Sequence, residues 1–113
     1  MSKRAVALVI SQSRDEARDA ARKLASLLEK EGFALFTISD VEIKGVTKVA
    51  PDALPDIESA VALGGDETIL RAAEITLLRD IPLLGINLGH VGFMAEVARP
   101  TIKAIGECII NRK

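Results

Sequence analysis

Short apolar runs alternate along this chain with longer segments in which apolar residues recur every three or four positions. Residues 5–10 (AVALVI), 60–63 (AVAL) and 82–86 (PLLGI) are nearly continuous apolar runs. Such runs are typical of strands buried on both faces of a parallel sheet. Residues 33–38 (FALFTI) predict one more strand of the same kind.

The first helical pattern follows the strand at 5–10. Its inward stripe is expected to consist of Ala17, Ala20, Ala21, Leu24, Leu27 and Leu28. Ser13 and Glu16 have the spacing of a capping box, which predicts that Ser13 caps this helix. Gly32 is expected to end it in a left-handed conformation.

Two further helices are predicted. The first spans about 67–79, capped by Asp66 or Thr68. Its inner stripe is expected to be Ile69, Leu70, Ala73 and Leu77. The second opens at Pro100, and its stripe is Ile102, Ile105 and Ile109.

Residues 39–58 show no sustained period and contain Gly45, Pro51 and Pro55, which predicts a long loop. Its mobility and a short strand around 46–49 remain open. The alternation of strands and helices predicts an α/β fold, a three-layer Rossmann-like domain with a parallel sheet and helices on both faces. We assign the domain to residues 1–98 and the final helical segment to residues 99–113.

The amino-acid composition excludes several classes of function. The 113 residues suit one domain, and 15 basic against 16 acidic residues give a net charge of −1, which argues against a nucleic-acid-binding module. With Cys108 and His90 as the lone cysteine and histidine, neither an internal disulfide nor a zinc cluster can form, and Cys108 is expected to be a buried hydrophobe. The run at 5–10 is too short for a signal segment or a membrane span, so we expect a cytoplasmic protein.

Candidate chemistry gathers first at the turn "GGDET". Gly64 and Gly65 follow a predicted strand, where the backbone can approach a ligand closely and the next helix presents its amides to a phosphate. Asp66 there could accept a proton from a hydroxyl, orient Mg²⁺, or simply cap the helix. Thr68 could bind phosphate or act as a second cap. Arg71 could reach back to a pyrophosphate or lie solvated on the surface.

The second candidate stretch is "NLGHVGF". Asn87 stands at the end of a predicted buried strand, where its side chain needs a partner. Phe93 could cover a nucleotide base or fill the core, and His90 is interpreted as an exposed loop residue. Both Gly-rich stretches follow strands of a parallel sheet, so we expect them to face one crevice.

Together, "LGGDETILRAAE" and "IPLLGINLGHVGFMAEV" resemble the NAD kinase family, whose members phosphorylate the 2′-hydroxyl of the adenosine ribose of NAD. The resemblance implies that Asp66 is the proton acceptor. It places Gly64, Gly65 and Thr68 at the nucleotide phosphates. It also implies nucleotide contacts for the three residues Arg71, Asn87 and Phe93, the last in the adenine pocket. The implied phosphoryl donor is ATP or inorganic polyphosphate, with Mg²⁺ as its usual partner.

Two departures from that family stand out. Glu67 occupies the position of the turn's fourth glycine, where its charge faces an incoming polyanion. The family's C-terminal β-rich domain, toward which the segment 99–113 would lead, is absent from these residues. The family's homo-oligomeric assembly is expected for a full-length chain. The alternatives are a nucleotide-binding module without turnover, or a kinase of the related diacylglycerol and sphingosine kinase group.

Overall fold

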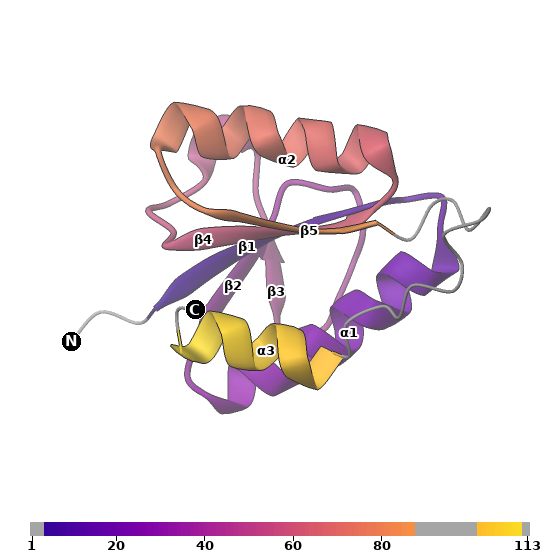
Figure 1. Ribbon diagram of the computed structural model, residues 1–113, viewed down its shortest axis with the longest axis vertical. Coiled ribbons are helices and arrows are strands. Elements are labelled where there is room, and N and C mark those ends of the chain that lie inside the picture. Colours follow the sequence, from indigo (N-terminus) through magenta and orange to yellow (C-terminus); the bar gives the residue numbers. More distant parts are fainter. Residues whose placement is uncertain (1–3, 88–101, 112–113) are drawn as a thin grey trace.

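The structure, a computed structural model, describes residues 4–87 and 102–111. Five parallel strands form one sheet in the order β3-β2-β1-β4-β5 (Figure 1). The strands are β1 (Ala5–Ile10), β2 (Ala34–Thr37), β3 (Val46–Lys48), β4 (Ser59–Gly64) and β5 (Leu83–Asn87). The helices are α1 (Asp15–Lys30), α2 (Asp66–Arg79) and α3 (Ile102–Asn111), with a short 3₁₀ turn at Pro51–Ala53.

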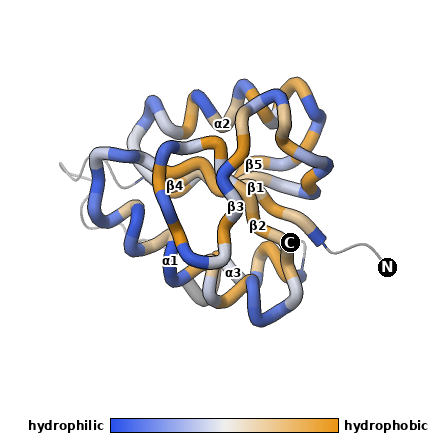
Figure 2. Tube along the Cα trace, turned by 180° about the vertical axis from the view of Figure 1, so that it is seen from behind, coloured by the Kyte–Doolittle hydropathy of each residue, from blue (hydrophilic) through white to orange (hydrophobic). Residues whose placement is uncertain are grey.

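The helices cover both faces of the sheet, which confirms the predicted three-layer α/β fold. In Figure 1, α2 lies over one face, and α1 and α3 lie over the other. Figure 2 shows the hydrophobic segments gathered in the strands between the more polar helices. Each of the four apolar runs in the sequence forms a strand of this sheet, because strands buried on both faces need apolar residues at nearly every position.

The two faces of the sheet differ in the size of their side chains. Successive residues of a strand point to opposite faces, so β1 and β4 divide into two sets. The face toward α1 and α3 carries the large side chains Val6, Leu8, Ile10, Val61 and Leu63. The face toward α2 carries Ala7, Val9, Ala60 and Ala62. On the face that carries the alanines, a helix with small side chains at the contact can bring its backbone close to the sheet.

That difference overturns the predicted stripe of α2. The residues that α2 buries are Thr68, Ala72 and Thr76, spaced by four, with Ile69 and Ile75 partly buried beside them. Leu70 and Leu77 were expected inside but are 65% and 80% exposed. The predicted stripe was therefore wrong at Leu70 and Leu77, whereas Ile69 packs against the core and Ala73 is partly buried. The small side chains of Thr68, Ala72 and Thr76 allow the helix to lie close to the alanines of β1 and β4.

The structure confirms the body of α1 but not its predicted start. Its buried residues are Ala17, Ala21, Leu24, Ala25 and Leu28. Gly32 has φ +87°, as expected at the helix end, and the Phe33 amide donates to the Leu28 carbonyl at 3.1 Å. The capping box is wrong: Arg14 is the N-cap, without a side-chain cap bond. The helix begins one residue too late for Ser13 to cap it, and the Ser13 hydroxyl lies 3.4 Å from that of Ser11.

The region 39–58 is more regular than a plain loop. The short strand left open in the sequence is present as β3, which pairs with β2 at the sheet edge. Four hydrophobic side chains of the region are buried against the sheet or its edge: Val41, Ile43, Leu54 and Ile57. The Arg79 guanidinium also donates to the carbonyls of Leu54 and Pro55 at 2.8 and 2.9 Å.

The last helix packs on α1 and belongs to the same three-layer unit. Ile105 and Ile109 are buried in the core shared with α1, as predicted. Pro100 and the side chain of Ile102 lie outside what the structure describes. Cys108 is exposed, so its predicted burial was wrong. The two buried isoleucines already take the inward stripe, and position 108 falls outside it.

Candidate functional site

The strand order locates the crevice in which such folds bind ligands. The chain runs from β1 outward to β2 and β3, then crosses back to place β4 on the other side of β1. Ligands of open α/β sheets bind at this reversal, beyond the carboxyl ends of the strands. A cleft of about 530 Å³ lies there. Its polar lining comprises Ser11, Gln12, Ser13, Ser39, Glu67, Thr68 and Arg71.

Gly64 and Gly65 form the turn from β4 into α2. A side chain on Gly64 would place its Cβ 2.6 Å from the Thr68 hydroxyl and 2.7 Å from the Cβ of Ser11, so the position has no room for one. Gly65 is the N-cap of α2, without a side-chain cap bond. Asp66 and Thr68 were predicted as caps, and both predictions were wrong. Both residues lie inside the first turn of the helix.

Asp66 and Asn87 meet at the carboxyl edge of the sheet. Gly64 and Asn87 are register partners in the β4–β5 ladder, so Asn87 ends its strand beside the glycine turn. The Asn87 Nδ2 group donates to Asp66 Oδ1 at 2.8 Å. Asn87 was expected to need a partner, and here the partner is the candidate proton acceptor. The bond orients the Asp66 carboxylate through one of its two oxygens.

The next residues of α2 face the cleft. Glu67 and Arg71 are exposed at its margin, one helical turn apart, and Thr68 is buried with only 8% of its surface exposed. Arg71 is thus on the surface, as one interpretation had it, but on the part that lines the crevice. The first-turn amides of α2 carry partial positive charge that favours an anion. The Glu67 carboxylate opposes that preference.

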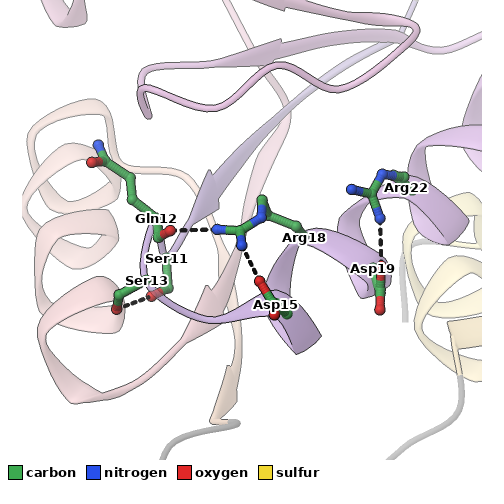
Figure 3. A network of polar contacts seen from close by, with 7 residues as sticks. All are labelled: Ser11, Gln12, Ser13, Asp15, Arg18, Asp19 and Arg22. Carbon is green, nitrogen blue, oxygen red and sulfur yellow. Dashed lines mark hydrogen bonds and ion pairs between the residues drawn. The ribbon is translucent and has the colours of Figure 1, made fainter.

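The loop after β1 forms the opposite wall, and Figure 3 shows how it is held. The Arg18 guanidinium binds the Gln12 carbonyl and the Asp15 carboxylate. The Ser11 amide donates to the Leu63 carbonyl at 2.9 Å, which ties the loop to the end of β4. The wall is therefore fixed to both α1 and β4.

A buried hydroxyl extends this wall toward β2. The Ser39 hydroxyl accepts from the Ile10 amide at 2.9 Å, and its own amide donates to the Thr37 hydroxyl at 3.1 Å. Both side chains are buried. The ends of β1 and β2 are thus linked through hydroxyl groups at the cleft floor.

Sequence reasoning missed this second wall. Ser13 was interpreted only as a cap, and Ser11, Ser39 and Arg14 were not considered. Arg14 lies against the glycine turn, with its Nη2 3.3 Å from the Cβ position of Gly65. The available signal was the position of "SQSR" directly after a strand that the sheet places at its centre, which is where open α/β folds bind ligands.

Among the described residues, a divalent cation would need a bound ligand to complete its coordination. The described residues, 4–87 and 102–111, contain no group of three His, Cys, Asp or Glu side chains that could hold a metal by themselves. Mg²⁺ is commonly bound by one or two carboxylates together with substrate phosphates. The adjacent carboxylates of Asp66 and Glu67 fit that pattern.

A second cavity, also of about 530 Å³, lies toward the other edge of the sheet. Its lining is mainly apolar, from Val61, Pro82, Leu83, Leu84 and Ile109. Its one charged group, Glu58, is bonded to Arg4. Among the described residues that line this cavity there is no lysine or arginine. Arg71 and the hydroxyls of Ser11, Ser13 and Thr68 line the cleft at the glycine turn, which is therefore the better candidate site.

Two sequence-predicted positions cannot be placed. Phe93 and His90 lie outside the described residues. Of the other predicted site residues, the structure brings Gly64, Gly65, Asp66 and Asn87 together at one edge, and it places Glu67, Thr68 and Arg71 along the adjoining cleft.

Comparison with known proteins identifies related chains. Residues 6–113 match the family described as the ATP-NAD kinase N-terminal domain. The NAD kinase of Mycolicibacterium paratuberculosis is 34% identical over 98% of this chain and 42% of its own length. The NAD kinase of Thermobifida fusca is 38% identical over 94% of this chain and 32% of its own. "NAD kinase 2" of Streptomyces coelicolor is 38% identical over 76% and 28%.

This chain therefore spans less than half the length of the relatives that it matches. In the part of the chain that the structure describes, no helix combines the length and the apolar character needed to cross a bilayer.

Proposed function

The chain belongs to the NAD kinase family, as that family's N-terminal domain, and from this premise we propose that it supplies the catalytic carboxylate of an NAD kinase. The reaction transfers the terminal phosphoryl group of ATP or inorganic polyphosphate to the 2′-hydroxyl of the adenosine ribose of NAD. The products are NADP and the shortened donor. The observation that carries the proposal is the Asp66–Asn87 bond at the glycine turn.

In this proposal, Asp66 accepts the proton as the ribose oxygen attacks the terminal phosphorus. The bond from that phosphorus to the bridging oxygen breaks, and the negative charge leaves with the donor. Asn87 holds Asp66 Oδ1 at 2.8 Å, so the second carboxylate oxygen faces the hydroxyl. Because the carboxylate is already oriented in the free protein, little conformational entropy is lost in orienting it when the substrate binds.

The rest of the cleft is assigned to binding. Gly64 and Gly65 let phosphates approach the backbone amides of α2, and Thr68 and Arg71 add donors along the helix. Mg²⁺ would enter with the donor phosphates and meet Asp66 and Glu67, where it would neutralise phosphate charge. Phe93 remains a predicted contact of the adenine base.

The test uses the longest natural chain that carries this sequence, assayed for NADP formation with NAD and either ATP or polyphosphate. We expect Asp66→Asn to lower turnover by about 10²- to 10⁴-fold, the range for loss of a positioned general base. Asp56→Asn is the matched control, an exposed aspartate in the loop before β4. An active wild type whose turnover survives Asp66→Asn would refute the assigned role.

A second candidate function is nucleotide binding without turnover, favoured by the Glu67 carboxylate at the margin of the phosphate cleft. It predicts saturable binding of NAD or ATP with no NADP formed. The similarity to NAD kinases supports the kinase over the diacylglycerol and sphingosine kinase alternative.

We also propose a homo-oligomer in the cytoplasm for the complete chain, by analogy with the family. Light scattering coupled to size exclusion would measure the assembly. A monomer at micromolar concentration would contradict it.

A further inference from the structure

Arg14 lies in direct contact with the glycine turn. A Cβ built on Gly65 would stand 3.3 Å from Arg14 Nη2, 3.6 Å from Nε and 3.8 Å from Cζ. The guanidinium thus occupies the side of Gly65 toward which a side chain would point. The Gly65 carbonyl accepts the Thr68 and Ile69 amides at 3.1 Å each. A cationic group with several donors therefore adjoins the first turn of α2.

The backbone that carries Arg14 is well supported. Arg14 is the N-cap of α1, and its carbonyl accepts the Ala17 and Arg18 amides at 3.1 and 3.3 Å. The loop before it is held by Arg18, which binds the Gln12 carbonyl (Figure 3). A guanidinium on a fixed loop loses less conformational freedom on binding an anion than one on a free side chain.

The sheet order assigns the two sides of the turn. β4 lies between β1 and β5, so the turn after β4 has the β5 end on one side and the β1 loop on the other. Asn87 binds Asp66 on the β5 side. Arg14 comes from the β1 side. The candidate base and the candidate cation therefore flank the same pair of glycines.

Phosphoryl transfer requires the attacking oxygen and the leaving oxygen to lie roughly in line across the phosphorus. If the ribose hydroxyl meets Asp66, the donor chain must extend away from Asp66. Across the glycine turn, that direction leads toward Arg14. A guanidinium presents paired donors that match phosphate oxygens, and a positive charge there offsets the carboxylates of Asp66 and Glu67.

We propose that Arg14 binds the phosphate chain of the phosphoryl donor, a nucleoside triphosphate or inorganic polyphosphate, and so distinguishes the donor from the NAD acceptor. This inference rests on the proposed function for the identity of the two substrates. Gly65 serves it by leaving the guanidinium room to lie on the turn. The competing role is purely structural, with Arg14 packing on Gly65 and contacting no ligand.

The test measures binding directly, by calorimetry with inorganic tripolyphosphate, ATP and NAD as separate probes, on the longest natural chain. We expect Arg14→Ala to weaken tripolyphosphate and ATP at least about tenfold, and NAD less than about threefold. Arg14→Lys should restore part of the loss. Arg22→Ala is the matched control: it removes the same charge from α1, at an exposed residue paired with Asp19, and should leave all three affinities unchanged.

A double-mutant cycle separates ligand contact from packing. An added methyl on Gly65 would stand 3.3 Å from Arg14 Nη2 and push the guanidinium aside by a few tenths of an ångström, so Gly65→Ala should weaken tripolyphosphate binding without changing any charge. In the Arg14→Ala background the same substitution should cost less than in the wild type, because it then only crowds the backbone amides and no longer shifts the guanidinium. Fully additive losses would show that the two residues act separately and would contradict the proposal.

These binding measurements can fail or succeed independently of the kinase activity proposed above. Binding needs no turnover, so an inactive protein that loses tripolyphosphate with Arg14→Ala would support the inference while the kinase activity fails. Three results would overturn it: no tripolyphosphate binding by the wild type, affinity within twofold in Arg14→Ala, or equal losses for NAD and ATP. Thermal melting of each variant confirms that it is folded.

Discussion

An arginine stands near each end of the central strand β1, and the two are used differently. At the amino end, Arg4 donates to both oxygens of Glu58, at 2.7 and 2.6 Å, and to the carbonyls of Ile110 and Ile109 at 2.8 and 2.9 Å. Its guanidinium also lies 4.5 Å from the centre of the Phe33 ring. Arg4 thus joins the start of β1, the approach to β4 and the end of α3.

At the carboxyl end of the sheet, the charged side chains of Glu67 and Arg71 line a cleft instead. Arg14 lies on the glycine turn, and Asp66 is bonded to Asn87 across the ends of β4 and β5. The amino edge directs its charges toward helix carbonyls and a carboxylate within the fold. The carboxyl edge places charges at a cavity of about 530 Å³. The comparison teaches that the arginine at one edge of this sheet holds parts of the fold together, whereas the other edge carries the candidate site.

Removing the Arg4 side chain, at the amino end of β1, should have the largest effect on stability. Arg4→Ala removes two hydrogen bonds to Glu58 and two to carbonyls of α3. We expect a loss of about 2 kcal/mol in the free energy of unfolding, since the two side chains are partly exposed and water compensates in part. Urea denaturation measures it, with nucleotide affinity of the folded protein unchanged.

Arg22→Ala provides the reference for that measurement. Its partner is Asp19, and their side chains are 56% and 64% exposed, so the loss should stay within about 0.5 kcal/mol. Equal losses in the two variants would remove the structural role assigned to Arg4.

At the carboxyl edge, Asn87→Ala should have the opposite effect to Arg4→Ala, lowering turnover and leaving stability almost unchanged. Without its hydrogen bond, Asp66 is no longer held for proton transfer, and turnover should fall roughly tenfold with little change in stability. Steady-state kinetics on the longest natural chain separates this effect on kcat from an effect on KM. An unchanged kcat would mean that Asp66 needs no such support.

Glu67→Gly should strengthen phosphate binding by about tenfold, because it removes a like charge from the cleft margin. Glu67→Gln keeps the side chain and removes only the charge, so comparing the two variants separates repulsion from crowding. Glu74→Gln, on an exposed residue of the same helix, is the control. The two Glu67 variants should bind the Mg²⁺–ATP complex more weakly, because Glu67 is proposed to meet the metal ion. Unchanged binding of metal-free tripolyphosphate in both of these variants would contradict the repulsion assigned to Glu67.

The smallest effect is expected at the exposed pair Lys48–Asp40. The hydrogen bond from Lys48 lowers the pKa of Asp40, with the lysine charge adding to it. Asp40 therefore contributes stability above its unfolded pKa of about 3.9, and the contribution is lost as the pH falls through the lower folded value.

Because both partners are exposed, Asp40→Asn should shift the melting temperature at pH 7 by no more than about 2 °C. The difference should vanish near pH 2. A larger shift at pH 7 would show that surface charge at the carboxyl edge supports the fold after all.

Most of the fold could be predicted from the pattern of residues. Each apolar run became a strand, and Gly32 ended α1 because its left-handed conformation suits glycine. The capping predictions failed at both helices, since cap position shifts by one residue without changing the helical period. The stripe of α2 failed for a different reason, because period alone does not say which of two apolar stripes faces the sheet.

Only part of the candidate site could be predicted from the sequence. "GGDET" and Asn87 could be recognised because both follow apolar runs and both motifs resemble one family. The wall formed by Ser11, Gln12 and Ser13 could not, because nothing in "SQSR" distinguishes a ligand-binding loop from a helix cap. Its significance comes from the sheet order, which sets the β1 loop beside the turn after β4.

The sequence by itself determined the parallel α/β architecture, the family, and the glycine turn with its carboxylate, because these depend on local order along the chain. The tertiary structure alone decided which face of α2 is buried, which arginine supports the fold and which lies beside the glycine turn. Those choices depend on packing between residues far apart in sequence. The small residues of α2 pack against the alanines of β1 and β4. The crossover from β3 to β4 places β4 beside β1, so that Arg14 lies next to Gly65.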